Sequence, residues 1–235
     1  MKREVIIALD FGSGDKALEF LDRFSETKPF VKIGMELFYG EGPQIVRDIK
    51  ARGHKVFLDL KLHDIPNTVG KAMKSLSSLD VDIINVHAAG AIEMMQAAAA
   101  GFADCDKKPL VIAVTQLTST DQQTMKNQLL IDYPMEEVVA KYAANAEAAG
   151  LAGVVCSPLE VPAVKKICGE SFVTVTPGVR FAGESKGDQK RVTTPQQAAE
   201  LGSDFIVMGR SITGAGNPEE AYIRAMKEFG GEADE

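Results

Sequence analysis

The sequence predicts a single-domain (β/α)8 TIM barrel, an α/β fold in which eight parallel strands alternate with helices. Short β-branched runs and longer amphipathic runs alternate eight times within 235 residues. The short runs are apolar almost throughout, as in strands that a parallel sheet buries on both faces. No internal repeat and no Pro/Ser-rich linker divides the chain. Eight such units in this length favour a closed barrel over an open doubly wound sheet.

The expected strands are short and rich in Val, Ile, Leu and Phe, residues that suit a buried sheet. They are Val5–Asp10, Phe30–Gly34, Lys55–Leu60, Asp82–His87, Leu110–Thr115, Ala152–Cys156, Phe172–Thr176 and Asp204–Met208.

Helical patterns fill the intervals, and Asp15–Phe24, Glu136–Ala149 and Pro218–Phe229 are the clearest of them. Thr194 and Asn217 each precede a proline, which is typical of a cap residue followed by Pro in the first helical position. The glycines expected to end helices are Gly53, Gly150, Gly169 and Gly202.

Composition places the whole chain, residues 1–235, in one globular domain whose tail, residues 230–235, is expected to fray. The hydrophobic fraction is 45% and the charged fraction 25%. A net charge of −7 argues against nucleic acid as the main partner. No apolar stretch reaches about 18 residues, so we expect no membrane span and a cytoplasmic location. Cys105, Cys156 and Cys168 form no CxxC pair, which predicts reduced thiols, with Cys156 in the core.

Charged residues gather at the ends of the first three strands, where a barrel of this kind builds its active site. Asp10 ends the first strand, and Lys32 lies within the second. Asp59 and Lys61 alternate with leucines on the third, so they are expected to share the inward face, with Asp64 just beyond. A solvated salt bridge is the ordinary interpretation of one such pair. Several charges on neighbouring strands favour a functional cluster, because buried ions must be paired.

The loops after the seventh and eighth strands predict an anion site, since barrels often bind phosphate there. Backbone amides near Gly209 and the guanidinium of Arg210 suit a phosphate dianion, and Arg180 and Gln189 could reach it from the preceding loop. The alternative is that this Gly- and Lys-rich loop, Pro177–Arg191, is only a mobile surface segment.

Two other signals are weaker. The segment GSGDKA fits a dinucleotide-binding pattern after a strand, but it leaves the charges on the third strand without a role. The histidines His54, His63 and His87 lack the spacing of a zinc site. His87 ends the fourth strand, where a core histidine or one that supports the pocket from behind is the expected role.

The segment DLKLHDIPNTV closely resembles the D-x-K-x-x-D-I-P-x-T signature of orotidine 5'-phosphate decarboxylases. ALD near the start, VKIG on the second strand, TPGVR after the seventh and VMGRSIT on the eighth extend the resemblance over nearly the whole chain, in the shorter bacterial form. The resemblance implies a decarboxylase that forms UMP and CO2 from orotidine 5'-phosphate, the last step of de novo UMP biosynthesis, without metal or cofactor.

The resemblance also implies a role for each matching residue. An alternating tetrad would consist of Lys32, Asp59, Lys61 and Asp64, with Lys61 as the proton donor. Asp64, Ile65 and Thr68 would enter the active site of the other subunit of a homodimer. Asp10 and Lys32 would hold the ribose, and Thr118 the pyrimidine. The phosphate would be bound by Arg180, Gln189, Gly209 and Arg210.

Three alternatives remain open. Hexulose-phosphate synthases and ketogulonate-phosphate decarboxylases resemble the chain through D-x-K-x-x-D, but they use magnesium and carry Glu at the position of Lys32. A lysine there would repel a divalent cation. A dinucleotide-binding oxidoreductase would rest on GSGDKA alone. A phosphate-ligand sensor on a barrel scaffold would bind UMP without turning over orotidine 5'-phosphate.

Overall fold

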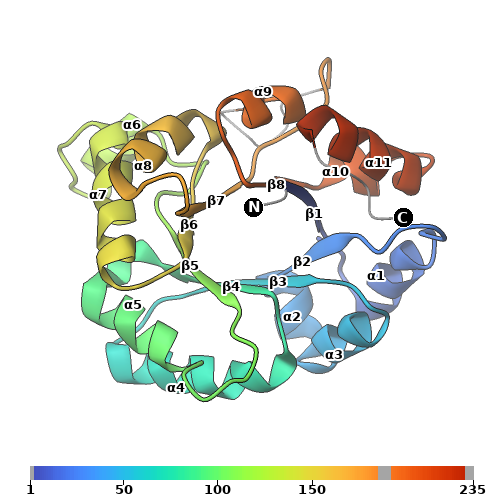
Figure 1. Ribbon diagram of the computed structural model, residues 1–235, viewed down its shortest axis with the longest axis horizontal. Helices are drawn as coiled ribbons and strands as arrows, with labels where there is room; N and C mark the ends of the chain where they lie inside the picture. Colours follow the sequence, from blue (N-terminus) through green and yellow to red (C-terminus); the bar gives the residue numbers. More distant parts are fainter. Residues whose placement is uncertain (1–2, 185–191, 231–235) are drawn as a thin grey trace.

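A closed barrel of eight parallel strands, in the order β1 to β8, forms the centre of the computed structural model, which describes residues 3–184 and 192–230 (Figure 1). The strands are β1 (Glu4–Ala8), β2 (Phe30–Gly34), β3 (Val56–Leu62), β4 (Ile83–His87), β5 (Leu110–Val114), β6 (Gly153–Val155), β7 (Val173–Thr176) and β8 (Phe205–Met208). The predicted barrel is therefore confirmed, with strand ends that differ from the expected ones by one or two residues. The first strand ends at Ala8, so Asp10 lies just beyond it rather than within it.

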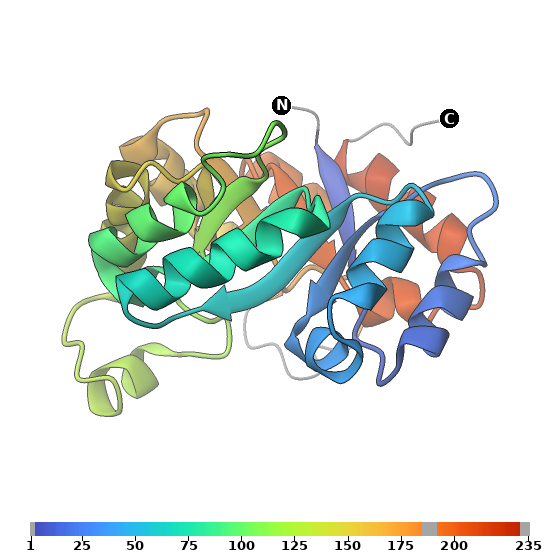
Figure 2. The same ribbon diagram turned by 90° about the horizontal axis from the view of Figure 1, so that it is seen from below.

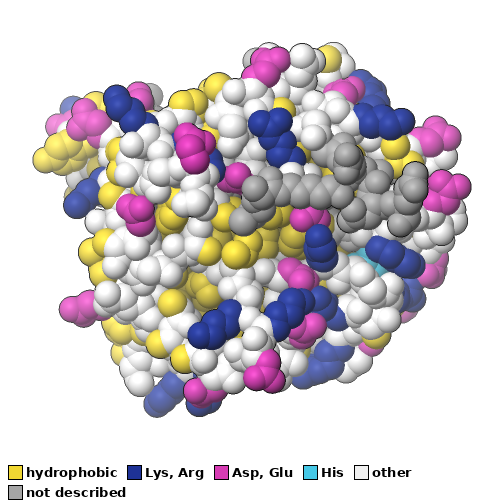
Figure 3. All heavy atoms as spheres, viewed as in Figure 1, with side chains coloured by type: hydrophobic (Ala, Val, Ile, Leu, Met, Phe, Trp, Pro, Cys, Tyr) yellow, Lys and Arg dark blue, Asp and Glu magenta, His cyan; other side chains and the backbone are white. Residues whose placement is uncertain are grey.

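The barrel closes because β1 pairs with both β2 and β8. Ile6 lies opposite Phe30 on one side and opposite Val207 on the other. Side chains from seven of the strands fill the interior in one apolar cluster, which includes Phe30, Phe57 and Phe205. Figure 3 shows the face at which the strands begin, where hydrophobic side chains occupy the centre and charged ones surround it. This packed interior closes that end of the barrel and leaves the other end for a site.

Helices cover the outside of the barrel and bury a second, larger apolar cluster against it. The longer ones are α1 (Gly14–Leu21), α3 (Gln44–Ala51), α4 (Pro66–Leu76), α5 (Ala91–Ala100), α7 (Met135–Ala148), α8 (Val161–Cys168) and α11 (Pro218–Phe229). Shorter ones are α2 (Met35–Glu41), α6 (Gln122–Asn127), α9 (Pro195–Glu200) and α10 (Arg210–Thr213), with 3-10 turns η1 (Ser77–Leu79), η2 (Ala88–Gly90) and η3 (Pro158–Glu160).

The expected helix punctuation is confirmed. The Thr194 hydroxyl accepts the Gln197 N–H at 3.2 Å, and Asn217 Oδ1 accepts the Glu220 N–H at 3.3 Å, each just before a helix that starts with proline. Gly150 and Gly202 follow α7 and α9 with φ of 79° and 89°, a region that favours glycine. The first helix is shorter than expected, because it begins at Gly14 and ends at Leu21.

Both ends of the described part of the chain lie at one end of the barrel, and the connection that carries α6 projects from the other (Figure 2). Among the described residues, no helix is both long and apolar enough to cross a membrane. Cys105, Cys156 and Cys168, all among the described residues, form no disulfide, and Cys156 is buried as expected. Gln189, Arg191 and residues 231–235, which figure in the sequence-based expectations, lie outside the described residues.

Candidate active site

Two adjoining cavities open where the strands end. One has a volume of about 240 Å³ and the other about 340 Å³, and they share Lys32, Pro177 and Val207. The first is also lined by Ala8, Asp10, Gly178, Val179, Arg180, Gly209, Arg210 and Ser211. The second is also lined by Phe57, Asp59, Lys61, Val114, Gln116, Leu117, Thr118, Ser119, Val155 and Cys156. Together they form an elongated site with Lys32 in the middle.

A row of alternating charges runs between the two cavities. Lys32 Nζ lies 3.4 Å from Asp10 Oδ1 and 3.4 Å from Asp59 Oδ2, and Lys61 Nζ donates to Asp59 Oδ1 at 2.6 Å. Asp59 is only 8% exposed, whereas Asp10 faces solvent. Since an unpaired buried carboxylate is costly, the two ammonium groups are what allow Asp59 to stay ionised there.

The pKa of Asp59 reflects this arrangement. Burial raises it, but the charges of Lys32 and Lys61 and hydrogen bonds from Lys61 and Asn85 outweigh that effect and lower the pKa below its ordinary value. A fixed negative charge therefore stands beside a fixed ammonium at the entrance to the second cavity.

The Lys61 side chain meets Asp59 because of a backbone irregularity that strand alternation does not predict. The pairing of β3 with β4 shifts between Leu58 and Leu62, and Lys61 has φ of 51°, in the left-handed region. Its backbone N–H donates to Asn85 Oδ1 at 2.8 Å. The expectation that Asp59 and Lys61 lie together is thus confirmed, but a bulge in the strand brings them together instead of a regular two-residue repeat.

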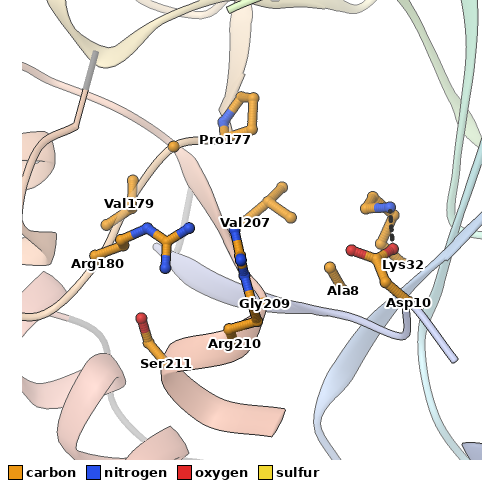
Figure 4. A pocket seen from close by; sticks show the side chains of 11 residues that line it. Ala8, Asp10, Lys32, Pro177, Val179, Arg180, Val207, Gly209, Arg210 and Ser211 are labelled. Atoms are coloured by element: carbon orange, nitrogen blue, oxygen red, sulfur yellow. Dashed lines mark hydrogen bonds and ion pairs between the residues drawn. The ribbon is translucent and has the colours of Figure 1, made fainter. Parts of the chain in front are cut away.

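The first cavity is cationic. Arg180, from the loop after β7, and Arg210, at the start of α10, extend toward the same part of it, next to Gly209 and Ser211 (Figure 4). The loop that carries Arg180 is held at its base, where the Arg180 N–H donates to the Thr193 carbonyl at 3.0 Å. Two guanidinium groups, one on a supported loop and one at the start of a helix, suit an anion such as a phosphate.

The second cavity combines an apolar wall with a few polar side chains. Phe57, Val114 and Val155 supply the apolar part, while Gln116 and Thr118, after β5, bring an amide and a hydroxyl. A flat, polar-edged ring would suit such a lining, with Asp59 and Lys61 at one side of it.

Three of the predicted site residues do not line either cavity of their own chain. Asp64, Ile65 and Thr68 are all exposed at the start of α4, and the Asp64 carboxylate accepts the Ile65 N–H at 2.6 Å. Within residues 3–184 and 192–230, Asp64 forms no ion pair with Lys61. Their expected place in a second subunit's site stays a prediction, as does the role of Gln189, which lies outside the described residues.

Sequence reasoning did not identify Asn85, Gln116 and Ser211 as site residues. A polar residue inside an apolar strand, as in IINVH, is the signal that could have identified Asn85. His87 lines neither cavity, and its expected role behind the pocket stays a prediction. Its ring stacks on His63 with centroids 5.6 Å apart, and burial, followed by the charges of His63 and Lys61, lowers its pKa.

The part of the chain that the structure describes contains no cluster of three or more His, Cys, Asp or Glu side chains suited to a metal ion. Asp10 and Asp59 could act as oxygen ligands, but the Lys32 ammonium lies between their carboxylates. The donor set here suits an organic anion better than a divalent cation.

Comparisons with known proteins identify the family. The model of the orotidine 5'-phosphate decarboxylase / HUMPS family matches residues 3–225. The chain is 56% identical over 236 residues to an orotidine 5'-phosphate decarboxylase of Geobacillus sp. (strain WCH70), with 99% of each sequence covered. It is 53% identical over 235 residues to the enzyme of that name from Bacillus cytotoxicus, covering 98% of this chain and 99% of the relative. The crystal structure of orotidine 5'-phosphate decarboxylase from Lactobacillus acidophilus superposes with a TM-score of 0.87 at 39% identity, covering 97% of this chain and 99% of that one.

Proposed function

This chain belongs to the orotidine 5'-phosphate decarboxylase / HUMPS family, and from that premise we propose that it is a carboxy-lyase converting orotidine 5'-phosphate to UMP and CO2. That reaction completes de novo UMP synthesis. The observation that carries the proposal is the paired Asp59 carboxylate and Lys61 ammonium, 2.6 Å apart, in the lining of the largely apolar second cavity, which adjoins the cationic first one.

The two cavities suggest how the substrate lies. Its phosphate occupies the first, near Arg180, Gly209 and Arg210, and its pyrimidine the second, near Thr118. The ribose then lies between them, next to Asp10 and Lys32. Gln189 is a further phosphate ligand on this proposal. In this pose the carboxylated carbon, C6, faces Asp59 and Lys61.

The chemistry needs no electron sink if fixed charges stabilise the transition state. The bond between C6 and the carboxylate breaks, CO2 leaves, and the electron pair stays on C6. The Lys61 ammonium stabilises that developing charge and then donates its proton to C6. Asp59 lies near the departing carboxylate, where the two negative charges repel each other. Lys32 and Asp64 keep the central pair in geometry, Asp64 from the partner subunit.

The phosphate is remote from the reacting carbon, so its binding energy can support the chemical step. Closure of the loop Pro177–Arg191 over the phosphate, which would desolvate the site, is part of the proposal. The hydrogen bond from the Arg180 N–H to the Thr193 carbonyl fixes the backbone of one proposed phosphate ligand at the base of this loop.

A homodimer completes the site on this proposal. Ile65 is a large apolar side chain that is 65% exposed, and it lies between the exposed polar residues Asp64 and Thr68 at the start of α4. An exposed isoleucine flanked by polar side chains suits a contact with a second copy of the chain.

The first experiment is to incubate the purified protein with orotidine 5'-phosphate and EDTA, following loss of the orotate absorbance and release of CO2. The expected result is fast turnover that the chelator does not slow. Folded protein that leaves orotidine 5'-phosphate intact would refute the proposal. Turnover of a sugar phosphate only after magnesium is added would favour the magnesium-dependent relatives, although the Lys32 ammonium argues against them.

A further inference from the structure

Asn85 is a fully buried polar residue in the middle of β4, between the apolar residues Ile84 and Val86. A buried carboxamide is stable only when its hydrogen bonds are made, so its partners show what it does.

Both halves of the carboxamide are bound to the charged pair of β3. Asn85 Oδ1 accepts the backbone N–H of Lys61 at 2.8 Å, and Asn85 Nδ2 donates to Asp59 Oδ1 at 2.7 Å. The same carboxylate oxygen accepts the Lys61 ammonium at 2.6 Å. The contacts therefore form a closed ring that runs from the Lys61 backbone through Asn85 and Asp59 to the Lys61 side chain.

The shape of β3 explains why the ring is needed. Leu58 pairs with Ile84 and Leu62 with Val86, so residues 59–61 of β3 face Asn85 alone on β4. A bulge of this kind interrupts the regular ladder of backbone hydrogen bonds. The Lys61 N–H finds its acceptor in the Asn85 side chain, at a φ of 51° that a non-glycine residue adopts only when its surroundings require it.

We propose that Asn85 is a positioning residue, which ties the Lys61 backbone to the Asp59 carboxylate and thereby aims the Lys61 ammonium at the second cavity. This inference rests on the roles of Lys61 and Asp59 proposed above. Asn85 acts through these two residues and is not among the side chains that line either cavity.

A purely structural role would have a different signature. Loss of a buried hydrogen-bonded side chain lowers stability, whichever strand carries it. Loss of positioning lowers the chemical rate while the cavities still bind ligand, because a displacement of about 1 Å can reduce catalysis by about 10²-fold. Turnover and ligand affinity must therefore be measured separately.

The test compares Asn85→Ala with Thr174→Val. Thr174 on β7 is also fully buried, and its hydroxyl both donates to Asp204 at 2.9 Å and accepts from the Asp204 N–H at 3.2 Å. We expect Asn85→Ala to lower kcat by about 10- to 100-fold, with the Kd for UMP within about threefold of the unsubstituted protein. Thr174→Val should lower Tm comparably but leave kcat nearly unchanged.

A second variant, Asn85→Asp, separates the two hydrogen bonds. It keeps an oxygen for the Lys61 N–H and the shape of the side chain, but it replaces the donor to Asp59 with another acceptor. We expect kcat to fall at least as far as in Asn85→Ala, and this variant carries the test if the alanine protein does not fold.

A folded Asn85→Ala or Asn85→Asp protein with kcat within about threefold of the unsubstituted protein would overturn the inference. So would a loss of UMP affinity that matches the loss of kcat. Lack of turnover by the unsubstituted protein would instead refute the proposed function, so the two failures are distinguishable.

Discussion

At the scale of single residues, the site depends on how four charged side chains neutralise one another. Asp59 accepts from Lys61 and lies 3.4 Å from Lys32, which in turn lies 3.4 Å from Asp10. Each inward-facing charge has an opposite neighbour. Removing one of them leaves its partner as an unpaired charge in a buried site, which is costly. Substitutions here should therefore affect the chemistry far more than conservative changes elsewhere.

Lys61→Ala should nearly abolish turnover, lowering kcat/KM by at least about 10⁴-fold, because it removes the proposed proton donor and with it the charge proposed to stabilise C6. The measurement is CO2 release from orotidine 5'-phosphate, with Kd for UMP as evidence of an intact cavity. Lys227→Ala, which removes an exposed lysine near the end of α11, is the matched control. Near-normal activity of Lys61→Ala would exclude Lys61 as the acid.

Arg210→Ala should weaken binding and turnover together, by about 10- to 100-fold in kcat/KM, because it removes the charge-assisted contact proposed for the phosphate. The loss should appear with orotidine 5'-phosphate and nearly vanish with orotidine, which lacks the phosphate. Arg47→Ala, on the exposed face of α3, serves as the control. An equal loss with both substrates would contradict a phosphate contact.

The residue scale is also where sequence reasoning was least complete. Asp59 and Lys61 were predicted to lie together from strand alternation, yet they meet through a bulge. Asn85 was not predicted because its role depends on the register between β3 and β4, which is a property of two strands. A periodic pattern in one segment does not show which residues of the neighbouring strand its backbone will pair with.

At the scale of secondary-structure elements, one half-buried side chain holds the connection between α1 and β2. Glu219, in the first turn of α11, accepts the N–H groups of Ser25, Glu26 and Thr27 and the hydroxyls of Ser25 and Thr27. One carboxylate thus anchors the connection between α1 and β2 to the last helix.

This anchor predicts a pH-dependent contribution to stability. Burial raises the pKa of Glu219, but the hydrogen bonds outweigh it and lower the pKa to about 2. A folded-state pKa below the unfolded value stabilises the protein above about pH 4.5, and the contribution disappears as the pH falls toward 2. Glu219→Gln should therefore lower the free energy of unfolding at pH 7, and the difference from the unsubstituted protein should shrink at pH 3.

Urea unfolding at the two pH values measures this prediction. Glu220→Gln removes the same charge from the same turn of α11 and is the control. The anchor would be disproved if Glu219→Gln and Glu220→Gln reduced stability equally at both pH values.

Elements with a strong internal pattern were well predicted. All eight strands and the helices α7 and α11 agree with the expected positions to within a few residues, because apolar periodicity and proline or glycine punctuation are local signals. Short helices such as α6, with six residues, were not predicted. Their formation depends on packing against neighbours more than on their own sequence.

At the scale of the whole molecule, the proposed dimer makes a prediction that a monomeric enzyme cannot satisfy. If Asp64 completes the site of the partner subunit, Lys61→Ala and Asp64→Ala homodimers are each defective at both sites. Subunit exchange between the two variants places both substitutions in one site and leaves the other intact. Activity should return on mixing, to about a quarter of the sites at random exchange.

The measurement is turnover of the mixture against that of each variant alone, with light scattering to determine the mass of the particles. Lys61→Ala mixed with Lys61→Ala,Asp64→Ala is the control, because no combination of those chains restores a complete site. Activity that stays additive although the subunits exchange would place Asp64 within its own chain's site.

Because β1 pairs with β8, the first and last described residues are neighbours: the Arg3 guanidinium lies over the Phe229 ring at 5.7 Å, and the Val5 N–H contacts the Met226 sulfur at 3.3 Å. The cavities open at the other end. The point at which the chain begins and ends is thus independent of how the charges around the cavities are arranged. A circularly permuted gene, with residues 3 and 230 joined by a short linker and new ends in an exposed connection, should encode the same arrangement of charges around the cavities.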